Sequence, residues 1–229
     1  MGFSLSIPGE ESHLATRQQL LDAAGEVFAR AGFKAATVRE ICERAGANIA
    51  AVNYHFGDKE KLYRAVLKET YRTAVAKYPA DFGLRENATP EERLRAFVHS
   101  LLLRIFSDGP SAQHGKLMAR EMMEPTGALD AVVKEDIRPL SEVLQSIVGD
   151  LLGPGATVET RRFCANSVVS QAVFYHHCRP VVSRIFPKLK FDAAGIECLT
   201  SHITDFSLAA IKSLAVHSRK RRSAGKFRK

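Results

Sequence analysis

Apolar positions recur at steps of three and four residues along most of the chain, which is the spacing of one face of an α-helix. The first such stripe begins near Leu14, and Gly32 supplies the stop that ends it. Its members are Leu20, Leu21, Ala24, Val27 and Phe28. The strict alternation typical of β-strands is scarce. The pattern therefore predicts an all-α protein with about nine helices.

Between residues 37 and 57 the pattern breaks into two short helices. Thr37 stands before the first, with Glu40 three residues on, and this pair predicts a capping box at the start of a helix over residues 38 to 45. Gly46 ends that helix, and a second begins near Ile49 and stops at Gly57. Two short helices joined by a glycine-containing turn are typical of a helix-turn-helix, whose second helix can enter the major groove of DNA.

After this pair, Asp58 is expected to cap a helix of about twenty residues that ends before Pro79 and connects to a second helical domain. Pro139 is expected to kink a later helix over residues 129 to 152, and Pro180 to end another that starts at Thr157. The predicted organisation is a flexible leader at 1–13, a helix-turn-helix domain at 14–60, an effector-binding and dimerisation domain at 61–216 and a basic disordered tail at 217–229.

Composition narrows the class of protein. In 229 residues, 45% apolar content is enough for a packed core, which excludes disorder of the whole chain. No run of 18 apolar residues predicts a membrane span, so we expect no membrane partner. Four scattered cysteines in apolar helical patterns, Cys42, Cys164, Cys178 and Cys198, indicate buried thiols in a reducing cytoplasm.

The net charge of +8 is concentrated at one end of the chain. Residues 217–229 hold seven Lys and Arg and no acid, whereas residues 1–56 hold five bases and six acids. The high isoelectric point thus belongs to the tail, for which we expect solvated disorder with non-specific phosphate contact as the alternative. Any specific recognition by the helix-turn-helix must depend on individually placed donors.

The string TVREICERAGANIAAVNYHFGDKEKLYRAVL, with the first helix ahead of it, resembles the DNA-binding domain of TetR-type transcriptional regulators. The matching positions are Thr37, Ile41, Ala45, Gly46, Tyr54, His55, Phe56, Lys59, Leu62 and Tyr63. A closer resemblance, to the subgroup with a CerR/CecR-type C-terminal domain, appears in AREMMEPTGALD (119–130), IRP (137–139) and SVVSQAVFYHHCRP (167–180). The resemblance implies a homodimer that binds a DNA operator and encloses a small-molecule effector.

The candidate DNA-binding residues fall into two groups. Asn53 is the candidate for specificity, because an amide can bond adenine in a bidentate way, although many relatives carry an aromatic residue there. Phosphate contact suits the hydroxyl, imidazole and ammonium donors. Arg39 has the alternative of pairing with Glu43, and Lys59 of stabilising the surface of its own helix. The full set is Thr37, Arg39, Asn48, Ala50, Asn53, Tyr54, His55 and Lys59.

Symmetry gives an independent reason to expect a dimer, since one short helix reads few bases and a pair doubles the contacts on a palindromic site. The last helix carries a narrow apolar seam suited to pairing across the axis in a four-helix bundle. The predicted interface is Val168, Gln171, Ala172, Tyr175, Ile196, Leu199, Ile203, Phe206 and Ala210.

An effector pocket is expected to combine apolar walls with a few polar groups. The candidates are Phe97, Leu101, Met118, Arg120, Glu121, Met122, Phe174, Tyr175, His176 and His177. For Phe97 and Met118 ordinary core packing is the alternative, and for Arg120 or Glu121 an ion pair that fixes its helix.

We expect no enzymatic activity and no cofactor, since no GxSxG, HExxH or P-loop spacing occurs. We also expect no metal site, because the side chains of adjacent helical residues such as His176, His177 and Cys178 point in directions too different to bind one ion. The main hypothesis is a ligand-responsive repressor that is released from its operator by an effector. The alternative hypothesis is an architectural or protein-docking DNA-binding dimer that responds to no small molecule.

Overall fold

The computed structural model describes the backbone of residues 8–106 and 110–226, and side chains over 13–106 and 113–215. The described residues form eleven α-helices and one π-helical turn, and no strand occurs among them. The all-α prediction is confirmed. The chain divides into two compact units, Met1–Thr73 with Gly109–Asp136, and Ala74–Asp108 with Ile137–Lys229.

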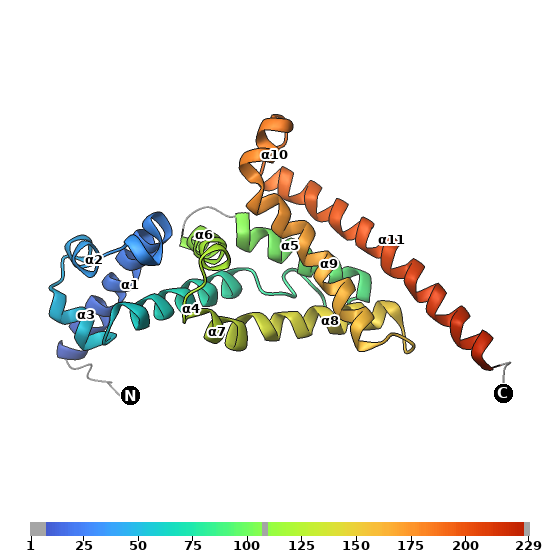
Figure 1. Cartoon of the computed structure of the whole chain (residues 1–229), viewed down its shortest axis with the longest axis horizontal. Coiled ribbons are helices and arrows are strands. Elements are labelled where there is room, and N and C mark those ends of the chain that lie inside the picture. The colour runs from blue at the N-terminus through green and yellow to red at the C-terminus, as the bar shows by residue number, and fades with distance from the viewer. Residues whose placement is uncertain (1–7, 107–109, 227–229) are drawn as a thin grey trace, which may run out of the picture. The chain divides into compact units, whose positions relative to one another are not determined.

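The first unit is built around α1 (Pro8–Ala35), which contacts α2 (Val38–Ala45), α3 (Ile49–His55) and α6 (Pro110–Met123) (Figure 1). The fourth helix, α4 (Lys59–Lys77), packs on α1 through Tyr63, whose ring meets Phe28 edge to face at 4.8 Å. The short α7 (Leu129–Val132) and most of the π-helical turn (Val133–Ile137) complete this unit.

Local capping explains where the short helices begin and end. Thr37 Oγ1 accepts a hydrogen bond from the N–H of Glu40 at 3.1 Å, and Gly46 ends α2 in the left-handed conformation at φ 64°. Asp58 Oδ1 accepts from the N–H of Lys61 at 2.7 Å and caps α4 as expected. Only half of the predicted capping box at Thr37 forms, because the Glu40 carboxylate pairs with Arg30.

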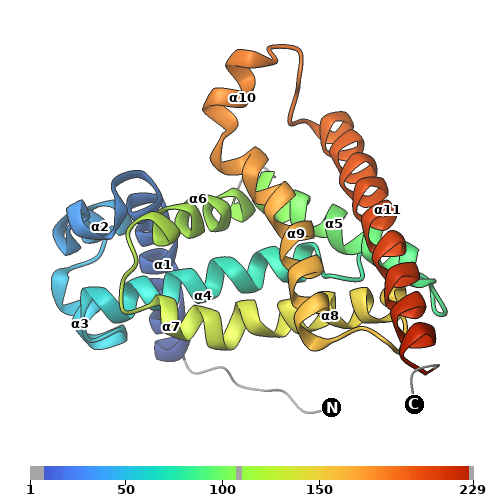
Figure 2. The same ribbon diagram turned by 45° about the vertical axis from the view of Figure 1, so that its right-hand side comes forward.

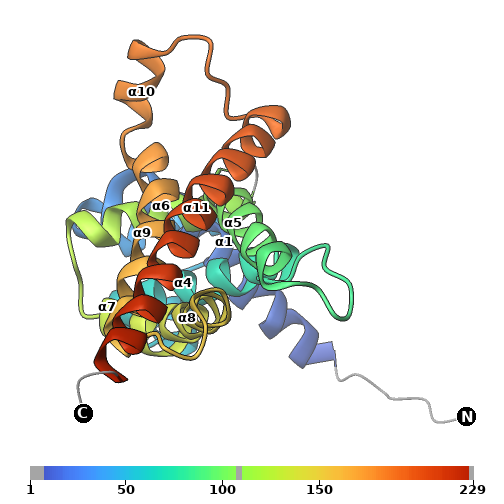
Figure 3. The same ribbon diagram turned by 90° about the vertical axis from the view of Figure 1, so that its right-hand side faces the viewer.

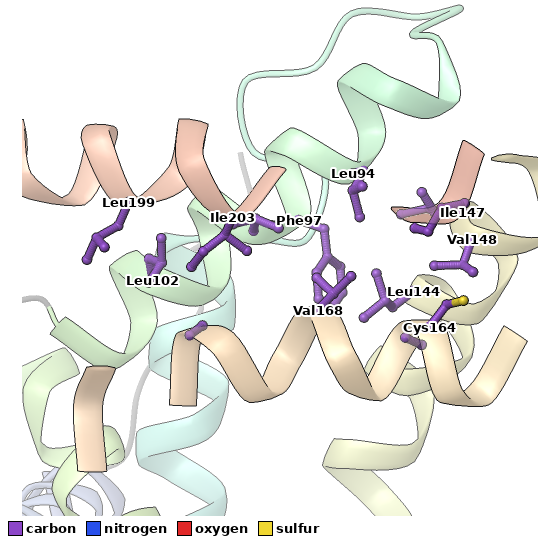
Figure 4. Close-up of a cluster of buried hydrophobic side chains, with 14 of the residues drawn as sticks. Leu94, Phe97, Leu102, Leu144, Ile147, Val148, Cys164, Val168, Leu199 and Ile203 are labelled. Atoms are coloured by element: carbon purple, nitrogen blue, oxygen red, sulfur yellow. The ribbon is translucent and has the colours of Figure 1, made fainter. Parts of the chain in front are cut away.

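The second unit holds a four-helix core (Figure 4). Its helices are α5 (Pro90–Phe106), α8 (Arg138–Leu152), α9 (Val158–His177) and α11 (Ala193–Lys226), and each touches the other three. Buried leucine, valine and phenylalanine side chains such as Leu94, Phe97 and Ile203 fill the space between them. Burial of this apolar surface is the main force that holds the unit together.

Several element boundaries differ from the sequence-based expectation. The helix expected over 129–152 is divided, because the π-helical turn Val133–Ile137 stands between α7 and α8. The short helix α10 (Arg179–Ile185) was not predicted. It arises because Pro180, expected as a terminator, occupies the first turn of a new helix, where proline fits well. Figures 2 and 3 show α10 projecting from the end of α9.

Both chain ends are more helical than predicted. The first helix α1 begins at Pro8, inside the expected leader, of which residues 1–7 lie outside the described part. At the other end α11 continues to Lys226, through the segment expected as a disordered tail. Lys, Arg and Ala are good helix formers, and extending an existing helix avoids the cost of nucleating one.

The cysteine prediction is correct for two thiols. Cys42 and Cys164 are buried, whereas Cys178 is half-buried and Cys198 is exposed on α11. A helical pattern alone does not distinguish a residue at the edge of an apolar stripe from one at its centre. Among the described residues no helix is long and apolar enough to cross a membrane.

Candidate nucleic-acid interface

The short helix α3 has a buried side and an exposed side. Val52 is fully buried and Phe56 nearly so, and these residues, four apart, anchor the helix to its unit. Asn48 caps the helix, its Oδ1 accepting from the N–H of Ala51 at 2.9 Å. This anchoring leaves Ala50 and Asn53 exposed on the other side. The face that carries the specificity candidate is thus open to a ligand.

Tyr54 and His55 stand beside this face. Tyr54 is 74% exposed, and its ring meets that of the half-buried His55 edge to face at 5.0 Å. Burial lowers the pKa of His55 below its usual value, and the charges of His13 and Arg17 lower it further. The Tyr54 hydroxyl therefore offers an exposed donor, and the His55 ring is largely neutral at pH 7.

Three other predicted DNA-binding residues have partners within the chain. The hydroxyl of Thr37 caps α2. The Arg39 guanidinium donates to Glu43 Oε1 at 2.9 Å, so Arg39 makes the ion pair with Glu43 that was its predicted alternative to DNA contact. Lys59 Nζ donates to the carbonyl of Lys34 at 3.3 Å and lies 4.7 Å from the centre of the Phe33 ring. Burial lowers the pKa of Lys59. Each of these residues has a structural role in the free protein.

Arg120 and Glu121 fix helix α6 within the first unit, but they do so through hydrogen bonds and not through the ion pair that the sequence offered as the alternative. Arg120 Nε donates to the carbonyl of Ala29 at 3.0 Å, close to the kink at Gly32 in α1. Tyr63 on α4 donates to Glu121 Oε2 at 2.8 Å, and Thr126 donates to the other oxygen of the same carboxylate. The partners of Tyr63 and Arg120 are 58 and 91 residues away in the chain, so no local motif indicates them.

The candidate pocket residues do not form one site in a single unit. Met118, Arg120, Glu121 and Met122 lie on α6 in the first unit, and the others lie in the second. Met118 is buried and Met122 exposed, and in the second unit Phe97 is core while Leu101 packs against that core. On α9, Phe174 and His177 are exposed, and Tyr175 and His176 are half-buried.

A cleft of about 680 Å³ opens in the second unit, at residues the sequence did not single out. It is lined by the segment from Phe82 to Ala88, by α5 and by Glu197 at the start of α11. Arg95 pairs with Glu197, and His99 Nε2 lies 4.0 Å from Glu197 Oε2. The Phe82 ring meets His99 edge to face at 6.2 Å. Charged and aromatic groups thus meet in one depression.

The structure places most predicted dimer residues inside one chain. Five of them are at most 4% exposed in the four-helix core of the second unit, namely Val168, Ala172, Ile196, Leu199 and Ile203. Gln171 is half-buried and donates to Ser207 Oγ at 3.1 Å, and Tyr175 is half-buried. Phe206 and Ala210 are exposed. The first part of the seam on α11, Ile196, Leu199 and Ile203, thus faces the core of its own chain, because a core helix and an interface helix share the same spacing.

Comparison with known proteins identifies the class. Residues 20–66 match the model for bacterial regulatory proteins of the tetR family, and residues 90–211 match the C-terminal domain model of the HTH-type transcriptional dual regulator CecR. The chain therefore belongs to the TetR family of helix-turn-helix transcriptional regulators. Within that family its second half places it with regulators that carry a CecR-type C-terminal domain, as the sequence predicted.

Individual relatives agree with this assignment. The chain is 32% identical over 167 residues to the dual regulator CecR of Shigella flexneri, covering 66% of this chain and 69% of the relative. It is 38% identical over 65 residues to the repressor AcnR of Corynebacterium efficiens, 28% of this chain and 35% of that one. A transcriptional regulator from Rhodococcus shares the fold, with a TM-score of 0.60 at 20% identity over 85% of this chain and 95% of the other.

Proposed function

We propose that the protein is a homodimeric repressor that binds a palindromic operator through α3 of each copy and is released by a small-molecule effector. The observation that carries the proposal is the exposed face of α3, on which Asn53 and Tyr54 project from a helix that Val52 holds in place. Asn53 reads a base edge in the major groove, and Tyr54 donates to a phosphate. Repression is proposed by likeness to AcnR, which is named a repressor and matches over 65 residues, while CecR, matched over 167 residues, is named a dual regulator.

The DNA-binding proposal is tested with an operator selected from random duplexes by the full-length protein. We expect Tyr54→Ala to weaken binding to all sequences, and Tyr54→Phe, which keeps the ring, to weaken it as much if the hydroxyl makes the contact. Asn53→Ala is expected to cost about 1–3 kcal/mol on the selected sequence and little on mutated ones. Equal affinity of wild type and Tyr54→Ala would remove the assignment.

We place the dimer surface on the exposed faces of α9 and α11. Phe163 on α9 is 63% exposed and Phe206 on α11 is 61% exposed, and both line one shallow groove with Leu214. Large exposed apolar groups that cluster on adjacent helices are typical of a surface covered by a partner. A second copy is the occupant that fits, since two such helix pairs form a four-helix bundle and a twofold axis matches a palindrome.

A charge placed on this surface tests the dimer. We expect Phe206→Arg to give a monomer in sedimentation experiments and to lose operator binding, because one reading head makes half the contacts. The matched control is Val143→Arg, a similar change at an exposed apolar residue of α8. A Phe206→Arg protein that remains dimeric would place the interface elsewhere.

For the effector we propose the cleft beside Phe82, Arg95 and His99. The segment from Phe82 to Ala88, which lines the cleft, comes soon after α4 in the chain. A ligand that orders this segment therefore acts on the end of α4, and α4 itself continues into the first unit. Its volume is within the range of about 300–1,000 Å³ found for small-molecule sites. Arg95 is paired with Glu197 in the free protein, so a carboxylate with a flat or apolar part would take the place of Glu197 on Arg95 and lie against the Phe82 ring.

A thermal-shift panel of aromatic and acyl carboxylates tests this site. Compounds that raise the melting temperature and dissociate the selected operator are the expected effectors, and Arg95→Gln is expected to abolish both effects. Stabilisation that survives Arg95→Gln would move the site away from the cleft. A panel without any stabilising compound would favour a DNA-binding dimer that docks a protein instead.

A further inference from the structure

The basic residues of the helix-turn-helix segment are mostly neutralised by acids. Residues 1–56 contain five Lys and Arg. Four of these form ion pairs, which are Arg30 with Glu40, Lys34 with Glu124, Arg39 with Glu43 and Arg44 with Glu26. Among the described ion pairs none involves the fifth, Arg17. Among the residues whose side chains the structure describes, Arg17 is therefore the base of this segment that has no carboxylate in an ion pair with it.

Arg17 lies next to the reading helix. Its guanidinium carbon is 5.3 Å from the centre of the Phe56 ring, at the residue that ends α3. One turn earlier on α1, the His13 ring lies 5.7 Å from that of Tyr54 and 6.2 Å from that of His55. Residues four apart share a helix face, so the same side of α1 carries both groups toward α3. His13 and Arg17 are both exposed.

We propose that His13 and Arg17, here called the α1 strip, are phosphate-contacting residues that extend the DNA surface from α3 onto the first turns of α1. The inference rests on the proposed function, because it requires that α3 be docked on DNA. When α3 lies in the major groove, Tyr54 contacts a phosphate at the edge of that groove. The α1 strip, which lies beside Tyr54, then contacts the neighbouring phosphates of the DNA backbone. Its contribution is charge and register, not sequence reading.

The geometry leaves the donors of the strip available. The Arg17 guanidinium lies over the Phe56 ring in a cation–π contact, which needs none of its five N–H donors, so these can bond phosphate oxygens. This contact also orders the side chain before DNA arrives, which lowers the entropy cost of binding.

The α1 strip matters because few other positive charges near α3 are free to meet a phosphate. Residues 1–56 carry one more acid than base, and the Arg39 and Lys59 donors have partners in the chain. Since burial holds His55 largely neutral at pH 7, that imidazole adds little charge either. Arg17 supplies the positive charge that this edge of α3 otherwise lacks.

The test measures operator affinity against salt concentration for the full-length protein. Replacing a base that contacts a phosphate lowers the slope of log K against log salt by about 0.9 per contact, and so by about 1.8 for a symmetric dimer. We expect Arg17→Gln to show this loss equally on the selected operator and on scrambled DNA. Arg17→Lys is expected to keep most of the slope, and His13→Gln to weaken binding with a smaller slope change. The control is Lys116→Gln, an exposed base on α6 of the same unit.

The outcomes separate this inference from the proposed function. If Tyr54→Ala weakens binding while Arg17→Gln leaves both affinity and slope unchanged, the α1 strip is overturned and the reading head stands. If Arg17→Lys loses as much as Arg17→Gln, the effect is due to lost packing on Phe56 and the phosphate contact is overturned. If the wild type selects no sequence at all, the proposed function itself fails.

Discussion

At the scale of single residues, a buried carboxylate on α6 joins that helix to α4 and to the loop that follows α6. Glu121 on α6 is 1% exposed and accepts hydrogen bonds from the Tyr63 hydroxyl and from Thr126. Burial, and then the bond to Glu121, raises the pKa of Tyr63 well above its usual value, so this hydroxyl stays a donor throughout the physiological range. A buried carboxylate is costly unless such donors satisfy it.

Tyr63→Phe removes one of these donors and leaves the ring. We expect it to lower the free energy of unfolding by about 1.5–3 kcal/mol, the range for a hydrogen bond to a charged group. Tyr71→Phe is the matched comparison, because that half-buried hydroxyl donates to the backbone carbonyl of Asp136 at 2.8 Å and should cost only ~0.5–1.5 kcal/mol. Urea titration measures both, and equal losses would mean that the bond to Glu121 has no special weight.

At the scale of elements, the turn between α2 and α3 sets the direction of the reading helix. Gly46 ends α2 with φ 64°, and its N–H bonds back to α2, while Asn48 starts α3 two residues later. A Cβ at Gly46 would meet no atom within 4 Å, so the need for glycine is one of backbone conformation and not of space.

Gly46→Ala therefore isolates the cost of the left-handed conformation, which is about 1–2 kcal/mol for a residue with a Cβ. We expect a loss of that size in thermal or urea unfolding. Gly46→Asn is expected to lose less, because asparagine tolerates this region better. If Gly46→Ala and Gly46→Asn lower the free energy of unfolding equally, interactions made by the asparagine side chain outweigh its better tolerance of the left-handed conformation.

The end of α9 shows two opposing effects on a histidine. A helix C-terminus favours a protonated imidazole, yet burial lowers the pKa of His176, and the nearby His177 and Arg179 add to the shift. The half-buried ring meets Phe106 edge to face at 5.6 Å. Desolvation therefore outweighs the helix dipole at this position.

A native pKa below the unfolded value means that the unfolded chain takes up the proton first as the pH falls. The contribution of neutral His176 to stability is thus complete above the unfolded pKa of about 6.5 and is lost as the pH falls below it. We expect His176→Gln to show a flatter decline of melting temperature between about pH 7.5 and about pH 5.5 than the wild type. If the melting temperature of His176→Gln declines as steeply as that of the wild type, the assignment to His176 is refuted.

How far the sequence predicts this structure depends on the distance between partners. Caps such as Thr37, Asp58 and Asp192 bond residues three positions away, so the helix starts they define could be predicted. The bond of Arg120 to the end of α1 joins residues 91 apart and leaves no local signal. For the candidate site, the exposed face of α3 follows from helical periodicity, whereas the α1 strip depends on how α1 packs against α3.

At the scale of the whole molecule, the excess positive charge and the helix-turn-helix segment lie in different parts of the chain. The +8 net charge comes mainly from residues 217–229, while the helix-turn-helix segment is nearly neutral and has most of its bases in ion pairs. Bulk attraction to DNA and selective recognition are therefore encoded in different parts of the chain. Dense positive charge binds any phosphate backbone, whereas placed donors distinguish one operator from other DNA.

This separation predicts what deletion of residues 217–229 does. We expect the shortened protein to bind scrambled DNA more weakly at low salt, with a salt slope smaller by up to ~0.9 for each phosphate that is no longer bound. Its preference for the selected operator over scrambled DNA should be kept or increased, because α3 and the α1 strip are intact. A variant with the seven bases replaced by glutamine controls for helix length at the end of α11, and fluorescence anisotropy across a salt series measures all three proteins. Loss of operator preference on deletion would show that the basic segment takes part in sequence recognition, since non-specific charge alone cannot distinguish the two duplexes.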